Sequence, residues 1–413
     1  MNTNLIKNVI SLGIVQIVSY ISPLLLFPYL SRTLGVDGFG IVMIAMSICS
    51  LGFIVTDYGF NLSATYWLAR NKTKKKYVSH YIGAIFTVKL LLAFLVSFFI
   101  YIYHACGLTE LSHRKDILSI VSLICVVQAF QSAWFFQGIE KMKQVAFYSV
   151  IYKLLYVILV LLFVDKSGEE IKVLYCLLIS NFVGSIVSLL GIYREGYYIY
   201  RPSLNLILRI LKRGFSFFIS RLSVSAYTAA STFIIGNFCG NGQAAIFSAA
   251  EKLYQAGVGV TSPVSQALYP YLARTKDRIL LYRFIILCIP VLFIVGGGCF
   301  YFSSQIINLI YGRGFEAASD ILKVFILCSF VNFISVSFGY PAFASIGKLN
   351  VANYSVILGG GVQIIAILIV FLFSSISAKN IAYCVLFTES FVLVFRVSFF
   401  LILSHRRYCR GGV

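Results

Sequence analysis

Charged side chains lie deep inside long apolar stretches of this sequence, where they need a specific reason to be present. If such a stretch crosses a bilayer, a charge facing lipid at its centre costs roughly 2.5–3.5 kcal/mol. Most of these residues must therefore be paired, lie near an interface or line a wet cavity. The set consists of Asp57, Lys89, Lys153, Arg221, Glu251, Lys252, Glu389 and Arg396.

The cations in this set outnumber the carboxylates five to three, which favours an anionic ligand. Arg221 and Lys252 are the strongest candidates to bind it, because their surroundings are rich in Ser, Thr and Gln. Lys89 and Lys153 lie about a third of the way into their stretches, where a long side chain can also reach the interface. Arg396 follows Glu389 by seven residues on the same helix face, either as a structural pair or as an ion pathway.

Motifs for enzymatic chemistry are absent from the sequence. No G-x-x-x-x-G-K-[ST] pattern occurs, the four histidines show no metal-ligand spacing, and no nucleophile motif is present. We therefore expect no enzyme, no metal site and no cofactor. Energy for any transport would come from an ion gradient or from consumption of the product, with H⁺ or Na⁺ as the coupling ion. The candidate ion-binding carboxylates are Asp57, Glu251 and Glu389.

Composition predicts an all-α polytopic membrane protein. Of the 413 residues, 60% are hydrophobic and 12% are charged, and the mean hydropathy is +0.90. The apolar stretches run for about 20 residues, the length that a helix needs to cross a bilayer. We expect about twelve transmembrane helices, at 9–30, 39–64, 81–103, 116–137, 146–164, 173–193, 215–237, 244–270, 279–302, 318–341, 351–373 and 381–403.

The net charge of +20 is distributed as in a membrane protein rather than a nucleic-acid-binding one. Lys and Arg concentrate in the even-numbered loops, above all at 70–76 and 194–213. This asymmetry predicts that both termini are cytoplasmic and that the basic rim attracts membrane lipids. The short loops leave no soluble basic face for nucleic acid.

The two halves of the chain repeat. One match is a heptapeptide: Val145-Ala-Phe-Tyr-Ser-Val-Ile151 recurs as Val351-Ala-Asn-Tyr-Ser-Val-Ile357. A second match has nearly the same offset and pairs Tyr66-Trp-Leu-Ala-Arg70 with Pro270-Tyr-Leu-Ala-Arg274. Six spans separate the repeats, so we expect two pseudo-symmetric six-helix lobes related by an axis along the membrane normal. The expected lobes are 1–195 and 214–413, joined by a cytoplasmic linker at 196–213 whose residues 203–212 form an amphipathic surface helix.

Several motifs resemble those of a known family. Phe27-Pro-Tyr-Leu-Ser-Arg-Thr-Leu-Gly-Val-Asp-Gly-Phe-Gly40, Trp134-Phe-Phe-Gln-Gly-Ile-Glu-Lys-Met142, Ala249-Ala-Glu-Lys-Leu-Tyr254 and Phe338-Gly-Tyr-Pro341 are similar to stretches of the bacterial O-antigen flippases. These belong to the polysaccharide transporter family of the multidrug/oligosaccharidyl-lipid/polysaccharide flippase superfamily. The resemblance runs from about residue 5 to about residue 400.

The resemblance implies a function and a location. The substrate would be an undecaprenyl-diphosphate-linked oligosaccharide, moved from the cytoplasmic to the periplasmic leaflet of the bacterial inner membrane. Its diphosphate would bind in a central cationic cavity. Polysaccharide polymerase and chain-length regulator proteins are the implied partners. By position, the resemblance places Arg221, Glu251 and Lys252 in this cavity, with Asp57 and Arg32 beside it. Their charge within predicted spans adds Lys153 to the candidate diphosphate ligands Arg221, Lys252 and Arg32, and Glu389 to the candidate carboxylates Asp57 and Glu251.

Three other interpretations compete. A multidrug cation antiporter of the same superfamily would need acidic, aromatic walls, whereas cations predominate here. A major-facilitator sugar carrier would carry a G-x-x-x-D-R pattern after its second span, which the sequence Ala69-Arg-Asn-Lys-Thr-Lys-Lys75 does not match. A non-transporting scaffold or a polymerase of polysaccharide assembly would leave the charges within the spans unexplained.

Overall fold

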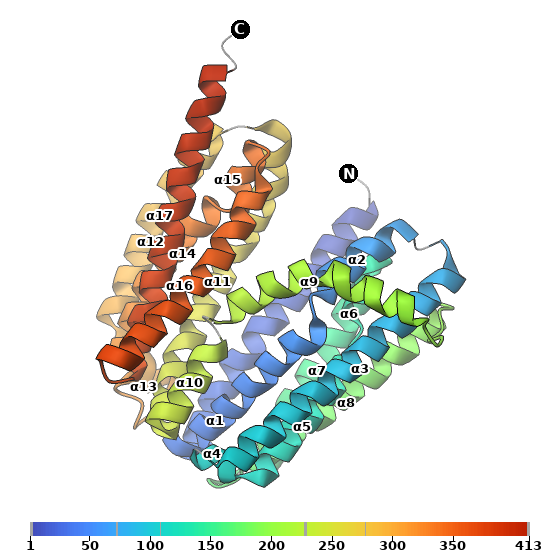
Figure 1. Cartoon of the computed structure of the whole chain (residues 1–413). Helices are drawn as coiled ribbons and strands as arrows, with labels where there is room; N and C mark the ends of the chain where they lie inside the picture. Colours follow the sequence, from blue (N-terminus) through green and yellow to red (C-terminus); the bar gives the residue numbers. More distant parts are fainter. Residues whose placement is uncertain (1–2, 72, 108, 227–228, 277, 411–413) are drawn as a thin grey trace. The chain divides into compact units, whose positions relative to one another are not determined.

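The protein is all-α. The computed structural model describes residues 3–71, 73–107, 109–226, 229–276 and 278–410, and within this part it contains helices and turns but no strand (Figure 1). The all-α prediction is confirmed. The chain separates into two compact units, Met1–Leu222 and Ser223–Val413, which are described one at a time.

The first unit is built on a very long helix, α1, which Gly35 divides in two. Gly35 has φ 72° and ψ −175°, a conformation open to glycine and strained for other residues. Figure 1 shows α1, α3, α5, α7 and α8 running side by side. The helices are α1 (Thr3–Asp57), α2 (Phe60–Asn71), α3 (Lys75–Cys106), α4 (Glu110–His113), α5 (Lys115–Ala129), α6 (Ala133–Gly138), α7 (Met142–Phe163), α8 (Glu170–Arg194) and most of α9 (Leu204–Ala226).

The second unit repeats several of these features. Gly240, at φ 85° and ψ 174°, separates its first two helices as Gly35 divides α1. The helices are α10 (Ala229–Cys239), α11 (Asn241–Thr275), α12 (Arg278–Tyr301), α13 (Ser303–Tyr311), α14 (Ala318–Ser337), α15 (Tyr340–Ser345), α16 (Leu349–Phe373) and α17 (Ala378–Arg410).

A matching turn in each unit supports the internal repeat. After α6 the backbone turns through Glu140, at φ 63°, and the N–H of Lys141 donates to the carbonyl of Phe136 at 2.8 Å. After α15 it turns through Gly347, at φ 68°, and the N–H of Lys348 donates to Phe343 at 2.9 Å. Both turns lead directly into the helices α7 and α16, which carry the repeated heptapeptide.

Within the described part, nine helical stretches are long and apolar enough to cross a membrane. The first of them, Ser22–Asn71, contains the glycine break and so corresponds to the first two predicted spans. The predicted seventh span coincides with the end of α9 and the short apolar helix α10, and the predicted eighth with the more polar α11. The polytopic character predicted from hydropathy is therefore confirmed, with those two segments the least apolar.

One predicted boundary is wrong. The predicted surface helix 203–212 does not end before the seventh span, since α9 continues without interruption from Leu204 to Ala226. The predicted span 116–137 is confirmed by the apolar stretch Lys115–Gly138, within which the chain turns at residues 130–132 between α5 and α6. Helix α9 is amphipathic, with Ile207, Ile210 and Leu211 packed against the rest of the first unit.

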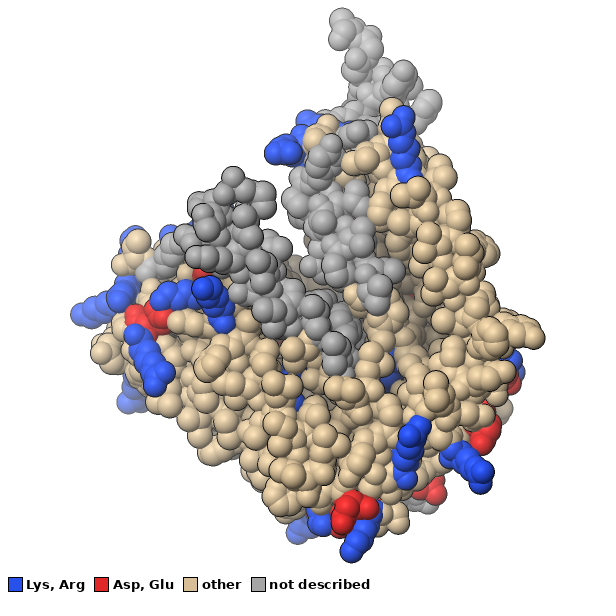
Figure 2. Space-filling model, turned by 180° about the vertical axis from the view of Figure 1, so that it is seen from behind, with Lys and Arg blue, Asp and Glu red and all other residues tan. Residues whose placement is uncertain are grey.

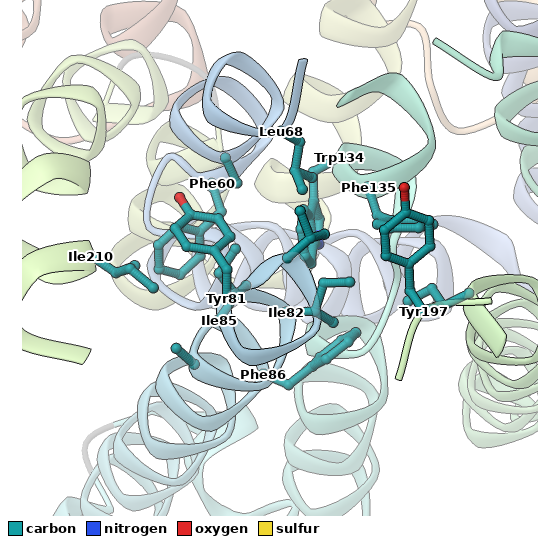
Figure 3. Packing of buried hydrophobic residues seen from close by; sticks show 14 of the residues in the cluster. Phe60, Leu68, Tyr81, Ile82, Ile85, Phe86, Trp134, Phe135, Tyr197 and Ile210 are labelled. Carbon is teal, nitrogen blue, oxygen red and sulfur yellow. The ribbon is translucent and has the colours of Figure 1, made fainter. Parts of the chain in front are cut away.

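One end of the first unit holds a dense aromatic core. Trp134, Phe135 and Phe136 of α6 are fully buried against residues of α2, α3 and α9. Figure 3 shows Trp134 between Leu68 and Ile82 in this cluster. Packing of this density fixes where α9 crosses the bundle, because large rings lose substantial burial energy if they shift.

The surface between the charged helix ends is apolar. Large side chains of α12 and α16, such as Leu287, Ile294 and Phe373, are exposed. On the face drawn in Figure 2, the described Lys and Arg side chains lie mostly toward helix ends, and the surface between them is largely uncharged. Exposed apolar surface of this extent is expected where helices meet lipid.

The close contact between α3 and the segment before α9 is testable at Gly83. A Cβ added there would overlap the backbone carbonyl of Tyr200. We expect Gly83→Ala to lower the stability of the protein in detergent by about 1–3 kcal/mol, as overpacking does. Gly361→Ala in α16 is the control, since nothing lies within 4 Å of its added Cβ. Equal unfolding temperatures for the two variants would contradict this packing.

Candidate functional site

The first unit contains a partly open cavity of about 500 Å³ between α1, α5, α7 and α8, whose surface is mostly apolar with polar side chains set into it. Among the described residues that line it, Lys153 is the one Lys or Arg, and none is Asp or Glu. A volume of this size suits a small ligand or one part of a larger one. The hydrogen-bonding side chains in its wall are those of Ser19, Ser22, Ser50, Gln128, Gln131, Tyr152, Lys153, Tyr156 and Asn181.

Lys153 is held in place by neighbours on two helices. Its ammonium group donates a hydrogen bond to the hydroxyl of Ser19 on α1 and lies 5.8 Å from the ring centre of Tyr152. Tyr152 in turn packs closely on Gly184 of α8, where a Cβ would lie 2.8 Å from the Tyr152 Cβ. Lys153 is half-buried, so its charge is presented to the cavity rather than to the lipid.

Two buried polar atoms in the cavity wall have no protein partner. The Gln128 Oε1 and the Tyr156 hydroxyl are both buried without a hydrogen bond. Nearby, the Gln131 Nε2 donates to Asn181 Oδ1 at 2.7 Å and is satisfied. Because an unpaired buried polar atom costs about 1–3 kcal/mol, these two groups indicate that the cavity binds water or a polar ligand.

Asp57 and Lys89 form a buried ion pair away from this cavity. Asp57 Oδ1 lies 3.7 Å from the Lys89 Nζ, and the side chains are 6% and 2% exposed. Of the two alternatives left open for Lys89, the structure thus shows the paired, buried one. Asp57 ends α1, where Tyr58 and Gly59 turn with positive φ, and Tyr58 stacks on Phe218 of α9 at 4.8 Å. This pair ties α1 to α3 beside the point where α9 packs.

In the second unit, Glu251 is buried within a polar cluster of α10 and α11. Its carboxylate accepts hydrogen bonds from Gln255 Nε2 at 3.0 Å and from the Thr232 hydroxyl at 3.4 Å. Lys252 is half-buried and donates to Gln255 Oε1 at 3.3 Å. Gln255 thus links the two adjacent charges, which a helix would otherwise point in different directions.

Glu389 and Arg396 lie in the interior of the second unit, on α17. Both Glu389 carboxylate oxygens accept from Asn332 Nδ2 of α14, at 3.2 and 3.3 Å. The Arg396 Nε donates to the Ser355 hydroxyl at 2.8 Å, and its Nη1 donates to the Ser335 carbonyl at 2.9 Å. Arg396 therefore joins α14, α16 and α17, which is a structural role.

The remaining predicted residues are exposed. Arg221 lies near the end of α9, and Arg32 lies on α1 shortly before the Gly35 break, beside a second cavity. Among the predicted ligand-binding cations, the structure thus places Lys153 in the main cavity of the first unit and Arg32 next to a different one. No group of three or more His, Cys, Asp or Glu residues in the described part has the geometry of a metal site.

Comparison with known proteins identifies the family. The family model described as "Polysaccharide biosynthesis protein" matches residues 5–276, which is more than half of the chain. The chain belongs to this family. The resemblance seen in the sequence motifs is thereby confirmed.

Two relatives of this family member share most of its length. Each bears the name "Putative O-antigen transporter". The one from Escherichia coli K12 is 29% identical over 341 residues, which cover 78% of this chain and 80% of the relative. The one from Shigella dysenteriae is 26% identical over 403 residues, covering 94% and 98%. The chain is thus a multi-pass membrane protein of the polysaccharide biosynthesis family, similar over most of its length to proteins named as O-antigen transporters.

Solved structures with the same fold are also transporters. An inward-facing multidrug resistance MATE transporter of the MOP superfamily has a TM-score of 0.70 at 14% identity, covering 97% of this chain and 98% of that one. The lipid II flippase MurJ, in an inward closed conformation, has a TM-score of 0.69 at 13% identity, covering 97% and 90%. At these identities the likeness shows the fold alone.

The uncharged polar residues of the cavity were not predicted. Gln128, Gln131 and Asn181 lie in apolar stretches, as Lys153 does, but the candidates were chosen by charge and these side chains are neutral. An amide in an apolar helix is also expensive, so the same argument applied to Gln and Asn would have selected them. Their side chains add to the hydrogen-bonding capacity of the wall, since each amide both donates and accepts.

The buried ion pair of this family member gives a stability prediction. Lys89→Met leaves the Asp57 carboxylate buried without its cation, and we expect a loss of about 3–5 kcal/mol in unfolding free energy. The double variant Asp57→Asn/Lys89→Met should recover most of the loss, because no charge is then left buried. Lys172→Met is the control, since its partner Glu169 pairs with it at the exposed surface. Thermal unfolding in detergent measures all three, and no recovery in the double variant would argue against the pair.

Proposed function

We propose that this protein flips undecaprenyl-diphosphate-linked O-antigen oligosaccharides from the cytoplasmic to the periplasmic leaflet of the bacterial inner membrane. The two lobes, 1–195 and 214–413, would move so that a binding site opens first to one side of the membrane and then to the other. No nucleotide would be hydrolysed. Membership in the polysaccharide family and the names of the two relatives support the substrate class.

The composition of the cavity wall is the observation that carries this proposal. One ammonium group, Lys153, stands among amide and hydroxyl groups in a wall without a carboxylate. Sugars are bound by amides and hydroxyls, and a phosphate by a cation. A diphosphate oxygen about 4 Å from Lys153 would gain about 4 kcal/mol before desolvation is counted. The unpaired atoms of Gln128 and Tyr156 offer further hydrogen bonds to a sugar.

The same wall disfavours the cation antiporter. A cationic drug entering this cavity would meet the Lys153 charge with no carboxylate in the lining to offset it. The buried carboxylates Asp57, Glu251 and Glu389 are instead engaged with Lys89, Thr232, Gln255 and Asn332. A MATE-like fold is therefore combined here with a wall suited to an anion.

The expected orientation follows from the basic loops. Both termini would be cytoplasmic, which places the Gly35 break and the loop after α7 on the periplasmic side. Polysaccharide polymerase and chain-length regulator proteins are the expected partners on that side, because they would receive the flipped units.

Lys153 gives the direct test of the binding site in cells. We expect deletion of the gene to leave lipid-linked repeat units on the cytoplasmic face and to abolish surface polysaccharide. Lys153→Gln should fail to restore the polysaccharide, while Lys153→Arg should restore it at least partly, because a cation is kept. Lys143→Gln is the control, since Lys143 is exposed on the same helix. Full restoration by Lys153→Gln at normal protein levels would remove Lys153 from the site.

Ion coupling through the buried carboxylates gives a second expectation. Asp57, Glu251 and Glu389 are the proposed H⁺ or Na⁺ sites, because each is a sheltered carboxylate within an apolar helix bundle. We expect the ratio of lipid-linked sugar between the two leaflets of membrane vesicles to fall at least about tenfold when the coupling gradient is collapsed, since roughly 1.4 kcal/mol of driving force sustains a tenfold ratio. Separate ionophores for H⁺ and Na⁺ identify the ion. Transport that survives collapse of both gradients would rule out coupling.

A further inference from the structure

A second cavity in the first unit lies at the end where α1 breaks. Its volume is about 610 Å³. One wall is the last helical turns of α1 before Gly35, and the other is the loop that follows α7. Its lining consists of Pro28, Tyr29, Arg32, Thr33, Asp165, Lys166 and Ser167.

Helix α1 connects this second cavity to the first. Residues from Ser19 to Phe27 contribute to the wall of the first cavity, and residues from Pro28 to Thr33 to the wall of the second. Phe27 and Pro28 are consecutive, so successive segments of one helix contribute to the two walls. A group leaving the surroundings of Lys153 along α1 toward the break at Gly35 would meet Arg32 next.

The loop after α7 is held by contacts that do not involve the side chain of Lys166. The Tyr29 hydroxyl donates to the carbonyl of Val164 at 2.5 Å. Glu169 accepts from the backbone N–H of Asp165 at 3.1 Å and pairs with Lys172. The hydrogen bond from Lys172 holds the pKa of Glu169 down at about 2, so this carboxylate stays charged and committed to the loop.

The charges of the second cavity suit a phosphate group. Arg32 and Lys166 supply two cations against the single carboxylate of Asp165. A guanidinium can bind two phosphate oxygens in parallel, while an ammonium acts as a point charge. The hydroxyls of Thr33 and Ser167 add donors of the kind that bind phosphate oxygens.

We propose that this second cavity binds the diphosphate of the transported lipid as it reaches the periplasmic side, with Arg32 and Lys166 as its ligands. The proposal rests on the proposed function and adds to it a second binding position, beyond Lys153, along α1. The diphosphate would thus pass from one cation to a pair of cations rather than cross an uncharged stretch. Anionic phospholipid headgroups share this chemistry, and the experiment separates the two sources.

Protection of a cysteine label tests the site without requiring transport. Full-length Ser167→Cys protein in nanodiscs of zwitterionic lipid is treated with a membrane-impermeant maleimide, and labelling at residue 167 is followed by mass spectrometry. We expect inorganic pyrophosphate to slow labelling by about tenfold at a concentration about ten times its dissociation constant. Chloride at equal ionic strength should not protect.

Matched variants assign the protection to the two cations. Adding Arg32→Gln and Lys166→Gln to the Ser167→Cys protein should abolish protection by pyrophosphate. Adding Lys115→Gln should leave it intact, because this exposed lysine is the first residue of α5 and does not line the second cavity. For each variant, the labelling rate with pyrophosphate is divided by the rate without it. A substitution that changes the intrinsic reactivity of the thiol therefore does not change the result.

Three results would overturn the proposal. Labelling that pyrophosphate does not slow removes the site. Protection that persists in the Arg32→Gln/Lys166→Gln variant removes these residues as ligands. Full protection by phosphatidylglycerol nanodiscs, with no further effect of pyrophosphate, makes the cavity a phospholipid site instead. Because protection does not depend on flipping, wild-type protein that binds pyrophosphate but moves no lipid-linked sugar would overturn the proposed function and not this site.

Discussion

A charge inside a membrane-spanning helix has to be sheltered from lipid, and this requirement organises both units of the protein. Asp57 and Lys89 shelter each other, Glu251 is enclosed by Gln255 and Thr232, and Arg396 is bonded to serines on two neighbouring helices. Each of these arrangements joins two or more helices or helix segments. The charges thus hold the bundles together in places where apolar packing alone would allow helices to slide.

Lys153 is sheltered in a different way, and this difference supports a role in transport. Its partners are the neutral Ser19 and the ring of Tyr152, so its positive charge is not cancelled by an acid in the cavity lining. The cavity beside it also holds unpaired polar atoms at Gln128 and Tyr156. A cation with neutral partners in this cavity can attract an anion. The charged groups elsewhere are already engaged with partners in the protein.

Sequence reasoning predicted those features that depend on local chemistry. The repeated heptapeptide and the lengths of the apolar stretches can be read directly from the sequence. The pairing of Asp57 with Lys89 was not predictable, because it depends on how α1 and α3 pack. The continuity of α9 was missed for a related reason: burial of Ile207, Ile210 and Leu211 against the aromatic core, rather than local amphipathicity, determines where that helix lies.

Transport by the purified protein tests the central claim most directly. The protein is reconstituted into liposomes with a fluorescent undecaprenyl-diphosphate oligosaccharide, and movement between leaflets is followed by quenching from one side, with an ion gradient imposed. The account predicts movement of the lipid-linked sugar that depends on the protein and is much faster than in protein-free liposomes. Liposomes in which the well-folded protein moves an organic cation but leaves the lipid-linked sugar in its original leaflet would contradict it.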